Sequence, residues 1–274
     1  TGTLEILVHG NFSADEARDI ARLAREALGV APAAGVPPVE VARLAPGEWW
    51  RAMTVDHPDS ALLMYLQGAQ SSDAERARVA LTAQILSAPF FNELRTERQL
   101  GYVAFAQAYP LYRVPGLLLA VQSPVAAPGV LAREFEAFLQ RQAAAAATLD
   151  EASFARQRQA LLDRLRESPK SLEERSDRLW ADIGLGAYGF DDRERVAAEV
   201  ERIGRDEWVR YFRSQFAGEG RRALLVKSRG AAHADSKAPA LPGRELPAGN
   251  AWRDAGGYFR FAREPVQPLP APVH

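Results

Sequence analysis

The amino-acid sequence predicts an α+β fold in which an antiparallel sheet carries helices packed on one face. Apolar runs of strand length dominate residues 49–67 and 102–123, whereas apolar residues at helical spacing dominate 130–216. Runs of strands followed by runs of helices are typical of α+β domains rather than of alternating βαβ units. The chain has 274 residues, of which 47% are hydrophobic, so it can bury a sizeable core.

The first 46 residues form a separate piece. Leu4–His9 reads as a strand that Gly10 ends, and Ser13-Ala14-Asp15-Glu16 is a capping box that opens a helix. Val30–Pro46 is rich in proline, alanine and glycine and reads as a linker. One strand and one helix are too little to fold alone, so we assign residues 1–46 to the end of a preceding domain plus a linker.

Residues 47–228 form the main predicted domain, and residues 229–274 form a carboxy-terminal tail that we expect to be irregular. Two predicted strands near the start are parted by the turn-forming His57-Pro58-Asp59, which indicates an antiparallel pair. The elements expected in the domain are strands at 49–55, 61–67, 102–109, 116–123 and 223–226, and helices at 72–87, 130–147, 151–167, 172–185 and 206–216, the third of these opened by a capping box at Thr148-Leu149-Asp150-Glu151.

Composition excludes several classes of partner. A formal net charge of −1 with interspersed signs provides no basic face for nucleic acid. The sequence has no apolar run long enough to span a bilayer, so we expect no membrane partner. The absence of cysteine rules out disulfides, a thiolate nucleophile and cysteine-bound zinc.

The sequence contains no recognisable catalytic motif. A helical zinc peptidase site needs two histidines close together on one helix face with a glutamate to activate water. The four histidines are isolated, and no G-x-S-x-G elbow is present. We therefore expect neither a catalytic residue nor a metal ligand in this chain; the histidines are His9, His57, His233 and His274.

The most informative segment runs from Phe91 to Tyr102 and reads Phe-Asn-Glu-Leu-Arg-Thr-Glu-Arg-Gln-Leu-Gly-Tyr. It follows a predicted helix and precedes a predicted strand, so we expect a surface junction. Arg95 and Tyr102 are hydrogen-bond donors suited to holding a peptide by its carbonyl oxygens. The alternative is structural: Arg95 pairs with Glu93 or Glu97, and Tyr102 begins a core strand.

This segment resembles, almost residue for residue, a segment near the start of the last domain in the insulin-degrading enzyme and pitrilysin family. The similarity continues at His9-Gly10-Asn11, at Ser123-Pro124 and at Asp206-Glu207-Trp208. The resemblance implies a zinc peptidase whose four related α+β domains form two halves around a chamber. Only the amino-terminal half carries the zinc motif, and this chain looks like the end of the third domain and all of the fourth.

The resemblance also implies roles and partners. Arg95 and Tyr102 would contact the backbone of a peptide substrate, zinc would belong to the parent protein, and the partner would be the amino-terminal catalytic half. The chain alone should then be inactive. Two alternatives are an inactive scaffold or assembly subunit of the same family and, less favoured, an independent peptidase with an unrecognised site. The resemblance favours the periplasm over the cytoplasm, as for bacterial pitrilysin-type enzymes.

Overall fold

The computed structural model describes residues 4–29, 37–247 and 257–265, and the chain divides into two compact units. The small unit comprises Thr1–Glu40, Glu167–Arg193 and Arg260–His274; the sheet unit comprises Val41–Arg166 and Glu194–Phe259. Within the described ranges, no helix combines the length and the apolar character needed to cross a bilayer.

The sheet unit is built on six strands in the order β4-β5-β3-β6-β2-β7. β3 pairs antiparallel with β5 and β6, and β4 pairs antiparallel with β5. β2 runs parallel to both β6 and β7, so the sheet is mixed. β4 forms one edge of this sheet. The strands are β2 (Gly47–Met53), β3 (Ser60–Gln67), β4 (Val103–Ala108), β5 (Gly116–Ser123), β6 (Arg222–Ser228) and β7 (Arg244–Glu245).

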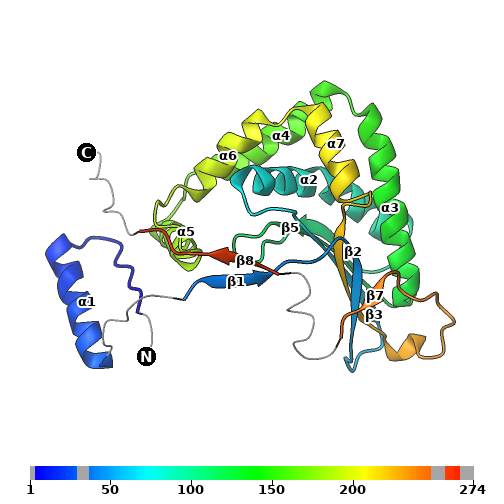
Figure 1. The fold of residues 1–274 in the computed structure, drawn as a ribbon, viewed down its shortest axis with the longest axis horizontal. Helices are drawn as coiled ribbons and strands as arrows, with labels where there is room; N and C mark the ends of the chain where they lie inside the picture. Colours follow the sequence, from blue (N-terminus) through cyan, green and yellow to red (C-terminus); the bar gives the residue numbers. More distant parts are fainter. Residues whose placement is uncertain (1–3, 30–36, 248–256, 266–274) are drawn as a thin grey trace. The chain divides into compact units, whose positions relative to one another are not determined.

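Helices cover one face of the sheet, as predicted, and Figure 1 shows α2, α3 and α7 on the same side of it. Alternation along β3 explains why: Leu62, Met64 and Leu66 are fully buried, while Leu63 on the opposite face is 36% exposed. The helices of this unit are α2 (Asp73–Phe91), α3 (Pro128–Thr148), α4 (Glu151–Arg166), α6 (Asp192–Arg202, which begins at the unit boundary) and α7 (Arg205–Gln215).

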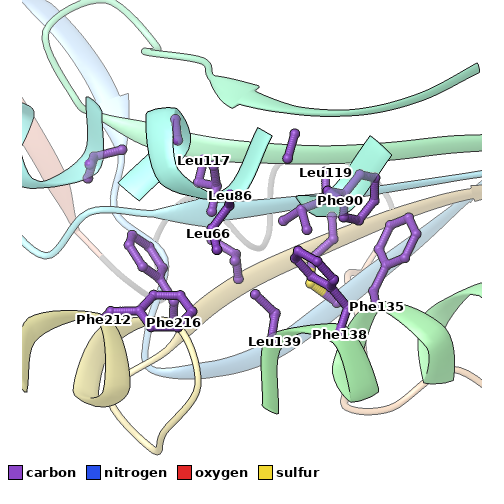
Figure 2. Packing of buried hydrophobic residues seen from close by; sticks show 14 of the residues in the cluster. Leu66, Leu86, Phe90, Leu117, Leu119, Phe135, Phe138, Leu139, Phe212 and Phe216 are labelled. Atoms are coloured by element: carbon purple, nitrogen blue, oxygen red, sulfur yellow. The ribbon is translucent and has the colours of Figure 1, made fainter. Parts of the chain in front are cut away.

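Aromatic side chains fill the core between the helices and the sheet (Figure 2). Phe90 of α2 meets Phe135 and Phe138 of α3 edge to face, with ring centroids 5.3 and 5.1 Å apart. Such edge-to-face pairs add to the stabilisation that comes from burying the rings. The end of α2, where the candidate segment begins, is therefore fixed to α3.

The predicted antiparallel pairing of the first two strands is wrong. β6 lies between β2 and β3, with Trp50 of β2 opposite Leu225 and Met64 of β3 opposite the same residue. The turn at His57-Pro58-Asp59 connects strands two places apart rather than neighbours. A local turn signal cannot show that a strand from 222–228 inserts between the two, because that pairing depends on long-range contacts.

The predicted capping box names the wrong capping residue for α4. Thr148 is the last residue of α3, and its hydroxyl donates to the Ala145 carbonyl. Asp150 caps α4 instead: its carboxylate accepts from the Ser153 backbone N–H at 2.8 Å and from the Ser153 hydroxyl at 2.6 Å. These hydrogen bonds lower the pKa of Asp150, the one from the hydroxyl most.

The small unit contains α1 (Ala14–Leu28) and α5 (Leu172–Gly184). The predicted capping box is confirmed, because Ser13 Oγ accepts from the Glu16 N–H at 3.2 Å and Glu16 accepts from the Ser13 N–H at 2.7 Å. Residues 4–9 are not a strand, contrary to prediction. Side chains hold this stretch instead of a ladder: the Glu5 carboxylate binds Tyr188 and Arg263.

The region from 229 onward contains short elements where an irregular tail is predicted. These are a 3₁₀ turn at Ala231–His233, strand β7, and β8 (Tyr258–Phe261), which pairs with β1 (Val39–Ala42). Helix α6, at Asp192–Arg202, is not predicted from the sequence. The expectations for His274 and for the linker between 30 and 36 lie outside the described residues.

Candidate functional site

The Phe91–Tyr102 segment continues α2 as a π-helix over Asn92–Glu97. Leu94 is fully buried and anchors it to the core. The chain then folds back, because the Leu100 N–H donates to the Leu94 carbonyl at 2.9 Å. The turn brings Leu100 beside the residue that precedes Arg95, so the two predicted site residues lie at the same junction although they are seven positions apart in the sequence.

Two backbone features shape the return of the chain to β4. Gln99 has a φ of +51°, a left-handed conformation that is uncommon for a residue with a side chain. Gly101 passes so close to β5 that an added Cβ would lie 1.8 Å from the Gln122 carbonyl oxygen. Glycine is required here by the close approach of two backbones, and this approach sets where Tyr102 emerges.

Replacing Gly101 with alanine is expected to cost about 1–3 kcal/mol of unfolding free energy, because the backbone must shift to remove the overlap with Gln122. Urea unfolding followed by circular dichroism measures this. Gly184→Ala is the matched control, since nothing lies within 4 Å of the added Cβ at that helical position. Equal stability of the Gly101→Ala variant and the unmodified chain would show that the close approach does not constrain the segment.

Glu93, one of the two carboxylates that lie two residues from Arg95, binds other cations. Glu93 binds Arg98, with Nε 3.3 Å from Oε1, and also binds Arg141. Arg98 in turn reaches Glu134 at 2.7 Å. These ion pairs engage the Glu93 carboxylate with arginines other than Arg95.

Arg95 has no ion pair or hydrogen bond to any residue that the structure describes. Its side chain is exposed, and its guanidinium lies over the Phe91 ring, with Cζ 4.7 Å from the ring centroid. The structural alternative, in which Arg95 pairs with Glu93 or Glu97, is therefore wrong. A guanidinium held on an aromatic face keeps its N–H donors available for a ligand.

Tyr102 is the residue before β4, and it is 85% exposed. Among the described residues its hydroxyl has no hydrogen-bond partner. Tyr102 does lead into β4, as the structural alternative states, but its own side chain stays outside the core, and Ala104 is the first side chain of this strand that enters the core. Arg95 and Tyr102 together present a charged donor and a neutral donor on one exposed junction.

The described histidines do not form a metal site. His9 Nδ1 lies 2.8 Å from Ser176 Oγ, His57 Nδ1 accepts from the Asp59 N–H at 3.0 Å, and His233 Nδ1 lies 3.0 Å from Ser60 Oγ. Over the described part of the chain, no three His, Asp or Glu side chains are grouped so that they could hold a metal ion.

Sequence reasoning did not identify the contribution of Phe91 or the role of Gln122. Phe91 and Arg95 are four residues apart in continuous helix, a spacing that places side chains on the same face and could have indicated the contact. The approach of Gly101, which precedes β4, to Gln122 of the neighbouring β5 depends on the pairing of these strands and leaves no local signal.

Comparison with known proteins places this geometry in context. Residues 81–180 match the family described as PQQ synthase PqqF-like, C-terminal lobe domain 4. The chain is 28% identical to the insulin-degrading enzyme of Drosophila melanogaster over 234 residues, which cover 81% of this chain and 23% of that enzyme. It is 39% identical to coenzyme PQQ synthesis protein F of Pseudomonas aeruginosa over 155 residues, which cover 57% of this chain and 20% of that protein.

A solved structure extends the similarity over nearly the whole chain. The crystal structure of pitrilysin superposes with a TM-score of 0.78 and 22% identity, covering 93% of this chain and 27% of pitrilysin. At this identity the match concerns the fold. The chain spans about a quarter or less of the length of these relatives.

Proposed function

Because this chain belongs to the insulinase and pitrilysin family, as a carboxy-terminal part of it, we propose that it is a fragment of the non-catalytic carboxy-terminal half of a zinc metalloendopeptidase. In this role it binds the peptide substrate and completes the active-site chamber together with an amino-terminal half that carries the zinc. The observation that carries the proposal is the exposed junction at which Arg95 and Tyr102 keep their donors without a partner among the described residues.

The two donors suit a peptide carbonyl. A guanidinium and a phenol can each donate to a carbonyl oxygen, and both bonds strengthen when a closing chamber excludes water. The zinc of the other half would polarise the scissile carbonyl. Arg95 and Tyr102 would hold the neighbouring backbone in place, which is a positioning and charge-stabilising role rather than a nucleophilic one.

The amino-terminal half is the proposed protein partner. A second contact is expected at helix α1, which the sequence assigns to the preceding domain: none of its residues is buried and its apolar stripe is exposed, with Ile20, Leu23 and Leu28 at 38, 56 and 63%. Contiguous exposed apolar surface of this kind often marks an interaction site. We propose that the rest of that preceding domain packs on the stripe.

Recombination of the two halves tests the proposal. We expect the purified chain alone to leave a quenched-fluorescence peptide uncut, and we expect cleavage that a chelator abolishes when the zinc-bearing half is added. Cleavage by this chain alone would favour an independent peptidase. The scaffold alternative would be favoured by two results together: the parent sequence lacks H-x-x-E-H, and the two halves associate without cleaving the peptide.

A further inference from the structure

A groove of about 620 Å³ lies between α2, α4 and the edge strand β4. This volume is within the range of ligand-binding clefts. Small side chains leave the space open: they are Ala83, Ser87 and Ala88 from α2, and Ala104, Ala106 and Ala108 from β4. Carboxamide side chains stand around it, contributed by Gln84, Asn92, Gln107 and Gln157.

The groove follows the free edge of β4 rather than one face of the sheet. Successive side chains of a strand point to opposite faces, yet the groove is lined both by Ala104 and Ala106 and by the intervening Phe105. A space that touches both faces of a terminal strand must run along its edge. β4 is the strand that ends the sheet on this side.

The backbone of β4 offers hydrogen-bonding groups to this edge. The Tyr109 N–H donates to the Gly116 carbonyl at 2.7 Å, which fixes the alternation of the antiparallel ladder with β5. Val103, Phe105 and Gln107 therefore bond to β5, and the N–H and C=O groups of the alternate residues point outward. Those residues are Ala104, Ala106 and Ala108, whose backbone groups have no hydrogen bond within the described residues.

Access to these groups varies along the groove. Ala108 is exposed, whereas Ala104 and Ala106 are only 5 and 1% exposed. Gln84 of α2 donates to Gln157 of α4 at 3.2 Å, and both side chains line the groove. An incoming chain would have to turn these side chains aside, and it could replace their amide–amide hydrogen bond with bonds of the same type.

We propose that the groove binds an extended peptide segment, which adds to the sheet as a strand antiparallel or parallel to β4. Only an extended peptide carries N–H and C=O groups at the spacing that the edge requires. The groove adjoins the Arg95 site, because Phe91 lines the groove and its ring also contacts the guanidinium of Arg95. This inference rests on the proposed function: the segment in the groove is a continuation of the peptide held at Arg95 and Tyr102.

Fluorescence anisotropy with the full chain tests the inference. The probe is a labelled nine-residue peptide of serine, threonine and valine, compared with the same peptide N-methylated at its three central residues. We expect the unmodified peptide to bind about tenfold more tightly, the change produced by two net backbone hydrogen bonds. Ala88→Leu, at an exposed position that lines the groove, is expected to abolish this preference. The matched control is Ala144→Leu, an exposed position on α3, which should preserve it.

The Arg95→Ala variant separates this inference from the proposed function. If both hold, Arg95→Ala weakens both peptides and keeps the tenfold ratio between them. If Arg95 has no role in binding, both affinities stay unchanged, and the ratio between the two peptides still shows whether backbone hydrogen bonds form in the groove. Equal binding of the two peptides to the unmodified chain, or a preference that survives Ala88→Leu, would overturn the added-strand inference.

Discussion

Replacing Arg95 with alanine is expected to lower kcat/KM of the recombined peptidase about hundredfold, the loss that a misplaced substrate backbone can cause at the reacting bond. The zinc content should stay unchanged and the unfolding free energy should fall by less than about 1 kcal/mol, because within the described chain Arg95 has no ion pair or hydrogen bond and only its cation–π contact with Phe91 is lost. Tyr102→Phe removes one neutral donor from a side chain that is 85% exposed, and we expect about a tenfold loss.

Steady-state kinetics with a peptide substrate measures these losses. Arg210→Ala is the matched control, since Arg210 is exposed on α7 and away from the segment in sequence. Arg95→Lys should recover only part of the activity, because lysine keeps the charge but not the planar set of donors. An Arg95→Ala enzyme with unchanged kcat/KM would leave the junction with no role in turnover.

Replacing Trp208 with alanine should lower the unfolding free energy by about 3–5 kcal/mol, more than the other substitutions proposed for this chain. Trp208 is 1% exposed, and its ring stacks on Phe212 at a centroid distance of 5.6 Å and an interplanar angle of 5°. Its indole Nε1 donates to Thr82 Oγ1 at 3.1 Å. The truncation therefore leaves a cavity between α7 and α2 and a buried hydroxyl that has lost one partner.

Urea unfolding followed by far-ultraviolet circular dichroism provides the measurement. Trp180→Ala makes the same change at a side chain that is 50% exposed, and we expect it to cost less than about 1 kcal/mol. Trp208→Phe should fall between the two, because it keeps an aromatic ring but loses the hydrogen bond. Similar costs at Trp208 and Trp180 would contradict the packing described for α7.

Local signals predicted the elements well and their pairing less well. The capping box at Ser13 and the strand at Gly116–Ser123 are found where the sequence places them. The position of β6 between β2 and β3 was missed, because strand order depends on contacts between residues far apart in the sequence. The wrong cap at Thr148 arose because Thr148 and Asp150 both match a capping pattern, and only the end of α3 decides between them.

The sequence predicts which residues form the candidate site but not how they are arranged in space. Arg95 and Tyr102 could be named from the sequence and from its resemblance to a family. The π-helix that presents Arg95, the ring beneath it and the pairing of Glu93 with other arginines are tertiary features. They decide between an arginine engaged in a structural ion pair and one that keeps its donors for a ligand, and the sequence alone left both readings open.

Infrared spectroscopy of a bound peptide tests the central claim most directly. A peptide is prepared with a single ¹³C carbonyl, placed at each position in turn, and its amide band is recorded on the unmodified chain and on Arg95→Ala. If Arg95 donates to the peptide backbone, one labelled carbonyl shows a lower stretching frequency on the unmodified chain and returns to the unbound value on the variant, since a charged donor weakens the C=O bond. Bands that are the same on both proteins at every position would contradict the claim that Arg95 holds the substrate by its backbone.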